Sequence, residues 1–171
     1  MKIFPHFSIV GFCNTYLIGG KSGGDAILVD PGYVDNELIS LIQERKYVVT
    51  DVLLTHAHEN HVQGVKTLMK VYQPTLHGAF ATIYGHPVHQ IHHDSQMECA
   101  GFSVRAIHVP GHSLDSIVYR VGDALFTGDA LSSGHVGKTS GYREHELLVA
   151  MVRQRIRSLE PRLPIFPGHG A

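Results

Sequence analysis

The sequence has little cysteine, no excess of either charge and no long apolar run. Its 171 residues include two cysteines, Cys13 and Cys99, which do not form a Cys-x-x-Cys pair. Two such cysteines cannot build a disulfide framework, so we expect a cytoplasmic protein in a reducing environment. Lys and Arg number 14, Asp and Glu number 15, and the formal net charge is -1. This balance argues against nucleic acids and membrane surfaces as partners, because both attract basic proteins.

The apolar segments are too short to span a bilayer. Residues 1–10, which Pro5 and His6 interrupt, make a poor signal peptide. The chain is 43% apolar and contains 18 glycines and 8 prolines, as is typical of a compact globular protein with many turns. We expect one domain over residues 1–171, long enough to bury a core without disulfides.

Short apolar runs alternate with amphipathic segments along the chain. Runs typical of strands occupy residues 13–18, 26–29, 51–55, 102–109, 116–121, 124–127 and 164–166. Apolar residues at helical spacing predict helices over residues 38–46, 62–72 and 148–156. This order predicts an α/β domain of packed layers that carries its functional residues at strand ends.

Histidine is the compositional outlier, with 14 residues. His56 and His58 follow a predicted strand at i, i+2 spacing. That spacing points both side chains to the same side of the strand, as two ligands of one metal require. His61 lies about one turn later, at the start of a predicted helix, and can approach the same point from another direction.

Three further strand ends each carry one possible ligand in a glycine-containing turn, and these ligands are His112, Asp129 and His169. Four strand ends that all carry His or Asp are hard to explain by packing. By contrast, we expect His108 to be a surface or hydrogen-bonded residue. We also expect mostly surface histidines between residues 75 and 93, where no strand end or fixed spacing organises them. That segment holds His77, His86, His89, His92 and His93.

Taken together, these motifs resemble the metallo-β-lactamase superfamily, and within it the glyoxalase II-like group. The family's H-x-H-x-D-H signature falls on residues 56–61, its P-G-H-[ST] on 110–113, its G-D on 128–129 and its G-H-G on 168–170. The match covers nearly the whole chain. The resemblance implies an αββα four-layer sandwich with metal ions at one rim of the two sheets.

Carried over residue by residue, the resemblance places one metal on His56, His58 and His112. It places a second metal on His61, His169 and the aspartate of the family signature. One or two zinc ions suit these donors, and iron is possible. The chemistry that the resemblance implies is attack of a metal-bound hydroxide on a carbonyl, with the metals stabilising the oxyanion.

The resemblance implies two catalytic positions, Asp129 and Asn60. In the family the residue at Asp129 bridges both metals, whereas Asn60 stands where the family has an aspartate. The amide keeps the shape but removes a negative charge, so we expect weaker binding of the second metal. Glu59 is the nearest carboxylate in sequence, but its neighbouring position points elsewhere. A mononuclear site on the three histidines and Asp129 is therefore an alternative.

The substrate side also departs from the family. Glyoxalase II enzymes continue beyond the last histidine into a helical region with basic residues for glutathione, and we expect half of that site to be missing here. Gly137-Lys138 resembles the family's contact with the substrate carboxylate, so we assign Lys138 to substrate binding, with a solvated loop lysine as the alternative. Tyr142 is a candidate substitute for the aromatic residue expected at Ser140. Asp30 either orients a ligand histidine or simply forms a turn.

Three classes of function follow. The first is a metal-dependent hydrolase of a small thioester or related acyl substrate. The second is a mononuclear-iron oxidoreductase of a thiol or persulfide, like the persulfide dioxygenases of the superfamily. The third is a metal-binding protein without turnover, suggested by Asn60. The charge balance disfavours the nuclease branches. We expect a small-molecule substrate, and the sequence does not indicate an oligomeric state.

Overall fold

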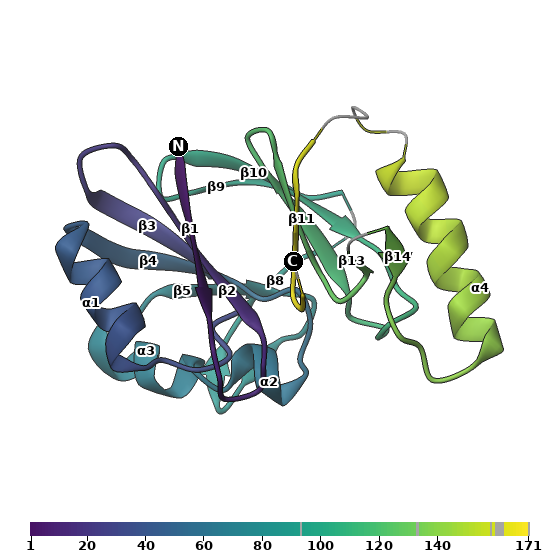
Figure 1. Ribbon diagram of the computed structural model, residues 1–171, viewed down its shortest axis with the longest axis horizontal. Coiled ribbons are helices and arrows are strands. Elements are labelled where there is room, and N and C mark those ends of the chain that lie inside the picture. The colour runs from purple at the N-terminus through teal and green to yellow at the C-terminus, as the bar shows by residue number, and fades with distance from the viewer. Residues whose placement is uncertain (93, 133, 158, 160–162, 171) are drawn as a thin grey trace.

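The computed structural model describes residues 1–92, 94–132, 134–157, 159 and 163–170. Two β-sheets face each other, and the longer helices lie on their outer sides (Figure 1). The first sheet has the strand order β1-β2-β3-β4-β5-β8. Its strands are β1 (Lys2–Phe7), β2 (Asn14–Gly19), β3 (Gly24–Val29), β4 (Tyr47–Leu53), β5 (Thr75–Gly78) and β8 (His89–Gln90). The first three strands are antiparallel, and the pairs β3–β4, β4–β5 and β5–β8 are parallel.

The second sheet has the strand order β15-β12-β11-β10-β9. Its strands are β9 (Gln96–Cys99), β10 (Phe102–His108), β11 (Ile117–Val121), β12 (Ala124–Gly128) and β15 (Ile165–Pro167). Every pair in it is antiparallel except β12–β15. Two short hairpins lie outside the sheets, and they pair β6 (Thr82–Ile83) with β7 (His86–Pro87) and β13 (Leu131–Ser132) with β14 (His135–Val136).

The helices are α1 (Asn36–Glu44), α2 (Glu59–Val62), α3 (Val65–Val71) and α4 (Tyr142–Met151), and α4 continues into a wider π-helical turn, η1 (Val152–Ile156). α1 begins where the Asp35 carboxylate accepts a hydrogen bond from the backbone N–H of Leu38 at 2.8 Å. This bond satisfies one of the backbone donors that a helix start leaves free.

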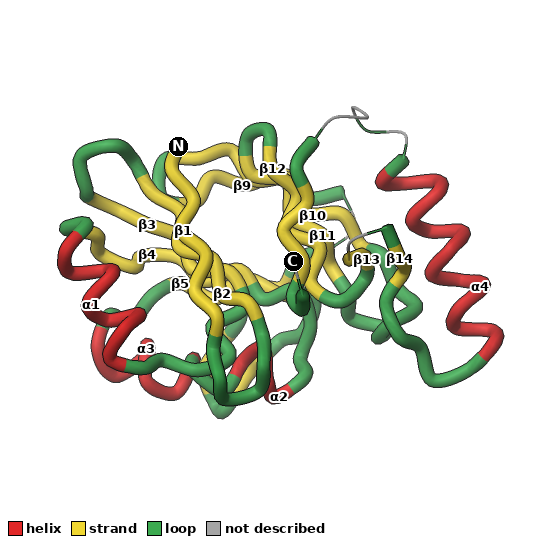
Figure 2. Tube along the Cα trace, in the orientation of Figure 1, coloured by secondary structure: helices red, strands yellow, loops and turns green. Residues whose placement is uncertain are grey.

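The alternation of side chains along the strands divides the core into layers. In β2, Leu17 faces the helices α1 and α3, whereas its neighbour Ile18 faces the second sheet. Leu38 of α1 and Leu68 of α3 pack on the outer face of the first sheet. Leu148 of α4 packs on the outer face of the second sheet. Figure 2 shows the helices outside the two sheets, so the expected αββα order of four layers is confirmed.

Some expected elements differ from the structure. Residues 2–7 form the edge strand β1, which the sequence patterns do not predict. The helix expected over residues 62–72 is divided into α2 and α3, with Gly64 between them donating to the backbone oxygen of Pro31 at 2.8 Å. The last helix starts at Tyr142, before the apolar stripe that predicted it. No described helix is long and apolar enough to cross a membrane.

Candidate metal centre

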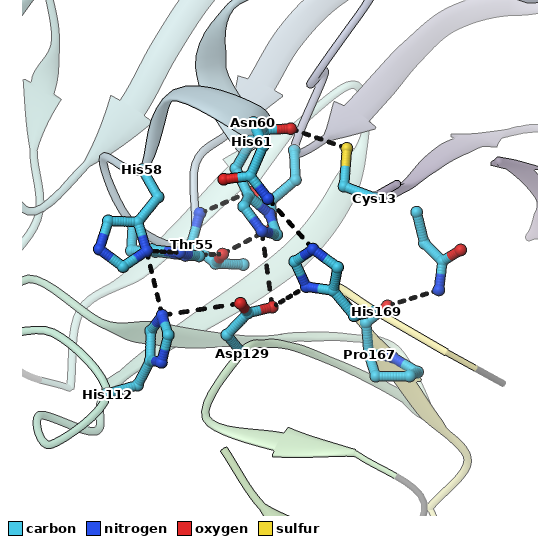
Figure 3. Close-up of polar contacts among 12 residues, drawn as sticks. Cys13, Thr55, His58, Asn60, His61, His112, Asp129, Pro167 and His169 are labelled. Atoms are coloured by element: carbon cyan, nitrogen blue, oxygen red, sulfur yellow. Dashed lines mark hydrogen bonds and ion pairs between the residues drawn. The ribbon is translucent and has the colours of Figure 1, made fainter. Parts of the chain in front are cut away.

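Six side chains singled out by the motifs converge at one rim of the two sheets (Figure 3). They come from the segments after four strands and from one short helix, and they are His56, His58, His61, His112, Asp129 and His169. The first two follow β4, and the third lies in α2. The other three follow β10, β12 and β15. The tertiary structure therefore brings together segments that are up to about two thirds of the chain apart in sequence.

Three histidines form a first donor group. Nδ1 of His58 lies 3.0 Å from Nε2 of His56 and 3.1 Å from Nε2 of His112. A ring nitrogen carries either one proton or one lone pair, so Nδ1 of His58 can hydrogen-bond only one of these neighbours. A cation at the centre would accept an electron pair from all three nitrogens. Three imidazoles with a further open position are a donor set that zinc commonly takes.

Asp129 lies between the first group and a second one. Its Oδ2 is 3.6 Å from Nε2 of His112. Its Oδ1 is 3.5 Å from Nε2 of His61 and 2.7 Å from Nδ1 of His169. Figure 3 shows the carboxylate between His112 and His169. Each oxygen of Asp129 thus faces a different donor group, as a bridging carboxylate would.

Buried hydrogen bonds determine which ring nitrogen faces the centre. The Thr55 hydroxyl donates to Oδ2 of Asp30 at 2.6 Å, so its oxygen is left to accept from Nδ1 of His56 at 3.0 Å. Nδ1 of His112 donates to the backbone oxygen of Lys138 at 2.7 Å. In both histidines Nδ1 carries the proton and Nε2 presents its lone pair to the centre. Such outer partners fix the orientation of ligand histidines in metal proteins.

His61 provides a direct test of whether a cation fits. Its Nε2 is one of two buried side-chain nitrogen or oxygen atoms without a hydrogen-bond partner among the described residues. Burial lowers the pKa of His61, but the nearby Asp129 carboxylate and the hydrogen-bonded Asp30 carboxylate outweigh burial and raise it to about 9. This environment attracts a positive charge next to Nε2, either a proton or a metal ion. The residues present therefore fit a metal.

The charge states of His56 and Asp129 also suit metal ligands. Burial and the neighbouring His61 lower the pKa of His56 to about 4, so its imidazole is neutral at pH 7 and can donate an electron pair. Burial raises the pKa of Asp129, but the nearby His61 and the hydrogen-bonded His169 outweigh burial and hold the pKa well below the usual range. Asp129 is thus a carboxylate at neutral pH.

Asn60 takes part in the second group through its amide nitrogen. Nδ2 of Asn60 lies 3.1 Å from Nε2 of His169 and donates to it, while Nδ1 of His169 donates to Asp129 at 2.7 Å. Both nitrogens of His169 are therefore engaged in hydrogen bonds that a cation would have to replace. Glu59 is exposed and has no described contact with this donor group; burial, and after it the charge of Glu59, raise the pKa of Tyr84.

Gly168 keeps the second group compact. A Cβ atom at this position would lie 2.5 Å from Oδ1 of Asp129 and 2.6 Å from Cε1 of His61. Both distances are too short for real contacts, so a larger side chain would displace the donors. Gly168, the first glycine of the Gly-His-Gly motif, is needed because the backbone at this position passes close to Asp129 and His61.

A cavity of about 430 Å³ opens beside Asp129. Its lining includes Lys138, Ser132, His135 and His169. Lys138, which the motif assigns to substrate binding, is thus one of the residues that line the cavity. Tyr142, by contrast, is 79% exposed at the start of α4 and is not among the described residues that line the cavity.

Several contributing residues carried no signal in the sequence. Asp115 accepts a hydrogen bond from the backbone N–H of Ala57 at 2.8 Å and so holds the segment between His56 and His58. The Cys13 thiol donates to the backbone oxygen of Asn60 at 2.7 Å. These partners are 58 and 47 residues apart in sequence, and no local spacing predicts such contacts.

The other histidines follow the expectation in part. His108 bonds the backbone oxygen of Leu114 through Nε2 at 2.7 Å, as a hydrogen-bonded residue. His89 and His92 are exposed. His77 is buried, so the expectation of a surface residue is wrong there, because β5 is an inner strand of the sheet. His93 lies outside the described residues.

Known proteins are similar to this chain in sequence and in fold. The family model of the metallo-beta-lactamase superfamily matches residues 8–79 and 79–169. An atrochrysone carboxyl ACP thioesterase of Aspergillus fumigatus is 36% identical over 167 residues, which are 92% of this chain and 50% of the relative. A probable polyketide biosynthesis zinc-dependent hydrolase, BaeB of Bacillus velezensis, is 27% identical over 90% of this chain and 71% of the relative. This chain thus spans about half the length of the fungal relative.

Comparison with solved structures also finds proteins of the same fold. The crystal structure of ETHE1 from Myxococcus xanthus superimposes with a TM-score of 0.87 at 27% sequence identity. The match covers 100% of this chain and 76% of that chain. This chain therefore shares its four-layer architecture with the Myxococcus xanthus protein over its whole length.

Proposed function

This chain belongs to the metallo-beta-lactamase superfamily, and on that premise we propose that it is a metal-dependent hydrolase of small acyl thioesters. The observation that carries the proposal is the position of Asp129, whose two oxygens face two histidine groups at the mouth of a cavity. The thioesterase and hydrolase names of the two relatives support the same class of reaction.

In this proposal His56, His58 and His112 are the ligands of the tighter site, together with Asp129. A divalent cation held by these residues would supply Lewis acidity for activating water and for polarising an acyl carbonyl. Zinc fits the neutral imidazoles and the single carboxylate, and iron is the competing metal.

The remaining steps depend on the chain's own residues. Thr55 and the backbone oxygen of Lys138 hold the protons of His56 and His112 on Nδ1, away from the reacting centre. Asp129 stays ionised and keeps a proton on Nδ1 of His169 by accepting its hydrogen bond. The Lys138 ammonium at the cavity would bind a carboxylate of the substrate, where the substrate carries one.

The second site, on His61, His169 and Asp129, is proposed to bind metal more weakly. Asn60 adds no charge there, and its amide N–H is directed to His169. Oxygen coordination by Asn60 would require the amide to turn around. We therefore propose fewer than two tightly held metals per chain.

The substrate is proposed to be a thioester with a small acyl group and without a strong preference for glutathione. Lys138 is the one Lys or Arg among the described residues that line the cavity. Recognition of a tripeptide with two carboxylates needs several fixed cationic contacts, and each charged hydrogen bond contributes roughly 1.5 to 3 kcal/mol.

The test is a comparison of kcat/KM for lactoyl-glutathione and for a lactoyl thioester of a simple thiol, with the protein loaded with Zn²⁺. The proposal is supported if the two kcat/KM values agree within about tenfold and if both activities are lost in His58→Ala. A thousandfold preference for glutathione would contradict the stated substrate range. Oxygen consumption with a persulfide and Fe²⁺, without thioester hydrolysis, would favour the iron oxidoreductase. Bound metal without any turnover would favour a binding protein.

A further inference from the structure

A second set of metal-type donors lies outside the candidate metal centre. It consists of Asp51 in β4, His77 in β5 and Cys99 at the end of β9. The first two belong to one sheet and the third to the other, so the cluster joins the two sheets. One donor atom of each side chain lies within 4.8 Å of the others.

The distances are those of a small coordination sphere. Oδ1 of Asp51 is 2.9 Å from Nε2 of His77, and Sγ of Cys99 is 3.6 Å from the same nitrogen. Donors on a tetrahedral zinc ion are separated by roughly 3.3 to 3.6 Å, from bond lengths of about 2.0 to 2.3 Å. A zinc ion between the three atoms therefore needs only a small expansion of the Asp51–His77 contact.

The cluster is buried and held in place from outside. Cys99 is 1% exposed and His77 is 6% exposed. The second oxygen of Asp51 accepts hydrogen bonds from the backbone N–H of Ala100 at 3.0 Å and from the Thr50 hydroxyl at 2.9 Å. These partners direct Oδ1 of Asp51 towards His77, as outer partners do for metal ligands.

The hydrogen bonding within the cluster is incomplete. Nε2 of His77 faces both a carboxylate and a thiol, although it can carry only one proton. A hydrogen-bond network within the cluster can therefore give the ring proton to only one of these two neighbours, whereas a cation between the three atoms would take an electron pair from each of them.

We propose that Asp51, His77 and Cys99 bind Zn²⁺ in a structural site that joins the two sheets, separate from the candidate metal centre. The charges balance, because one carboxylate and one thiolate neutralise a divalent cation in a buried place, and the imidazole stays neutral. Binding breaks the S–H bond of Cys99, forms a zinc–sulfur bond and releases the proton to water. The ring of His89, whose centroid lies 5.5 Å from that of His77, borders the cluster but is not part of the donor group, so the fourth coordination position is left to water.

The site has a distinctive spectroscopic signature, because its donor set contains sulfur. The donors of the candidate metal centre are nitrogen and oxygen atoms. Co²⁺ added to the metal-free full chain should therefore give a near-ultraviolet sulfur-to-cobalt charge-transfer band through Cys99 alone. The band is expected to persist in His58→Ala, in Cys13→Ser and in His92→Ala, and to disappear in Cys99→Ser. Cys13→Ser is the matched control, because it removes the other buried cysteine.

Two further measurements separate loss of the site from loss of the fold. Asp51→Asn keeps the shape and should reduce Co²⁺ affinity at this band at least tenfold. Zn²⁺ should raise the melting temperature of His58→Ala but not that of the double variant His58→Ala/Cys99→Ser, with both metal-free forms showing cooperative unfolding. No charge-transfer band at excess Co²⁺, or a band that is lost in Cys13→Ser and kept in Cys99→Ser, would overturn the proposal.

Discussion

Oδ2 of Asp30 lies 3.1 Å from Nδ1 of His61, and both side chains are almost completely buried. The same oxygen accepts the hydroxyl of Thr55, which in turn accepts from His56. One carboxylate therefore orients a histidine in each of the two donor groups. Of the two interpretations of Asp30 from the sequence, its contacts agree with a residue that orients ligands.

Asp30→Asn should weaken metal binding. The amide cannot accept from His61 and Thr55 as the carboxylate does, and loss of such an outer partner lowers metal affinity roughly 10- to 100-fold. Metal affinity is measured by competition with a chelating dye. Asp25→Asn, at an exposed position of β3, is the control and should leave the affinity unchanged. Equal affinities in both variants would show that Asp30 does not orient the ligands.

His58→Ala should abolish tightly bound metal at the candidate centre, because Nδ1 of His58 is the atom that both His56 and His112 approach. A metal that binds only the folded state stabilises it by mass action, so the variant should lose roughly 5–10 °C of melting temperature at a metal concentration of about 100 times Kd. Elemental analysis and thermal unfolding measure both effects. His92→Ala is the control, and an unchanged metal content in His58→Ala would refute the assignment.

Asn60→Asp should raise the number of tightly held metals towards two per chain at the candidate centre. The new carboxylate supplies the missing charge next to His169, where the amide now donates a hydrogen bond. Elemental analysis after dialysis against a weak chelator measures the number of metal ions per chain. Asn36→Asp in α1 is the charge-matched control. Two full equivalents at this centre in the unmutated protein would contradict the weak second site.

Lys138→Met should reduce kcat/KM by about tenfold or more for a succinyl thioester and leave it nearly unchanged for an acetyl thioester of the same thiol. The reason is that Lys138 lines the cavity beside Asp129 and binds the free carboxylate of the larger substrate. Lys21→Met, at an exposed turn, is the control. An equal loss with both substrates would show that Lys138 does not act on the carboxylate.

Gly168→Ala should destabilise the protein by roughly 1–3 kcal/mol and weaken metal binding, because overpacking a filled site forces its neighbours to move. The added Cβ would contact Oδ1 of Asp129 and the ring of His61. Denaturant unfolding and metal titration measure the two effects. Gly20→Ala is the control, since a Cβ there would meet nothing closer than 3.5 Å. Wild-type stability in Gly168→Ala would refute the close packing.

The sequence by itself predicted an α/β domain of packed layers, and the family resemblance of its motifs named the side chains that meet at the candidate metal centre. The apolar runs of residues 13–18 and 26–29 predicted strands, and the helical stripe of Leu38 and Ile42 predicted a buried helix face, because such patterns repeat with local backbone geometry. His56 and His58 share a side of the chain for the same local reason. The Gly-containing turns at Asp129 and His169 marked strand ends without any knowledge of the sheet order.

Only the tertiary structure decided which of these ends meet and what surrounds them. The contacts of Asp30 with His61, of Asn60 with His169 and of Cys99 with His77 join residues 22 to 109 positions apart. No local period encodes such pairs, since they depend on the order of strands within each sheet and on how the two sheets stack. The same reason explains why His77 looked like a surface histidine in sequence and lies buried between the sheets, within reach of a cysteine from the opposite sheet.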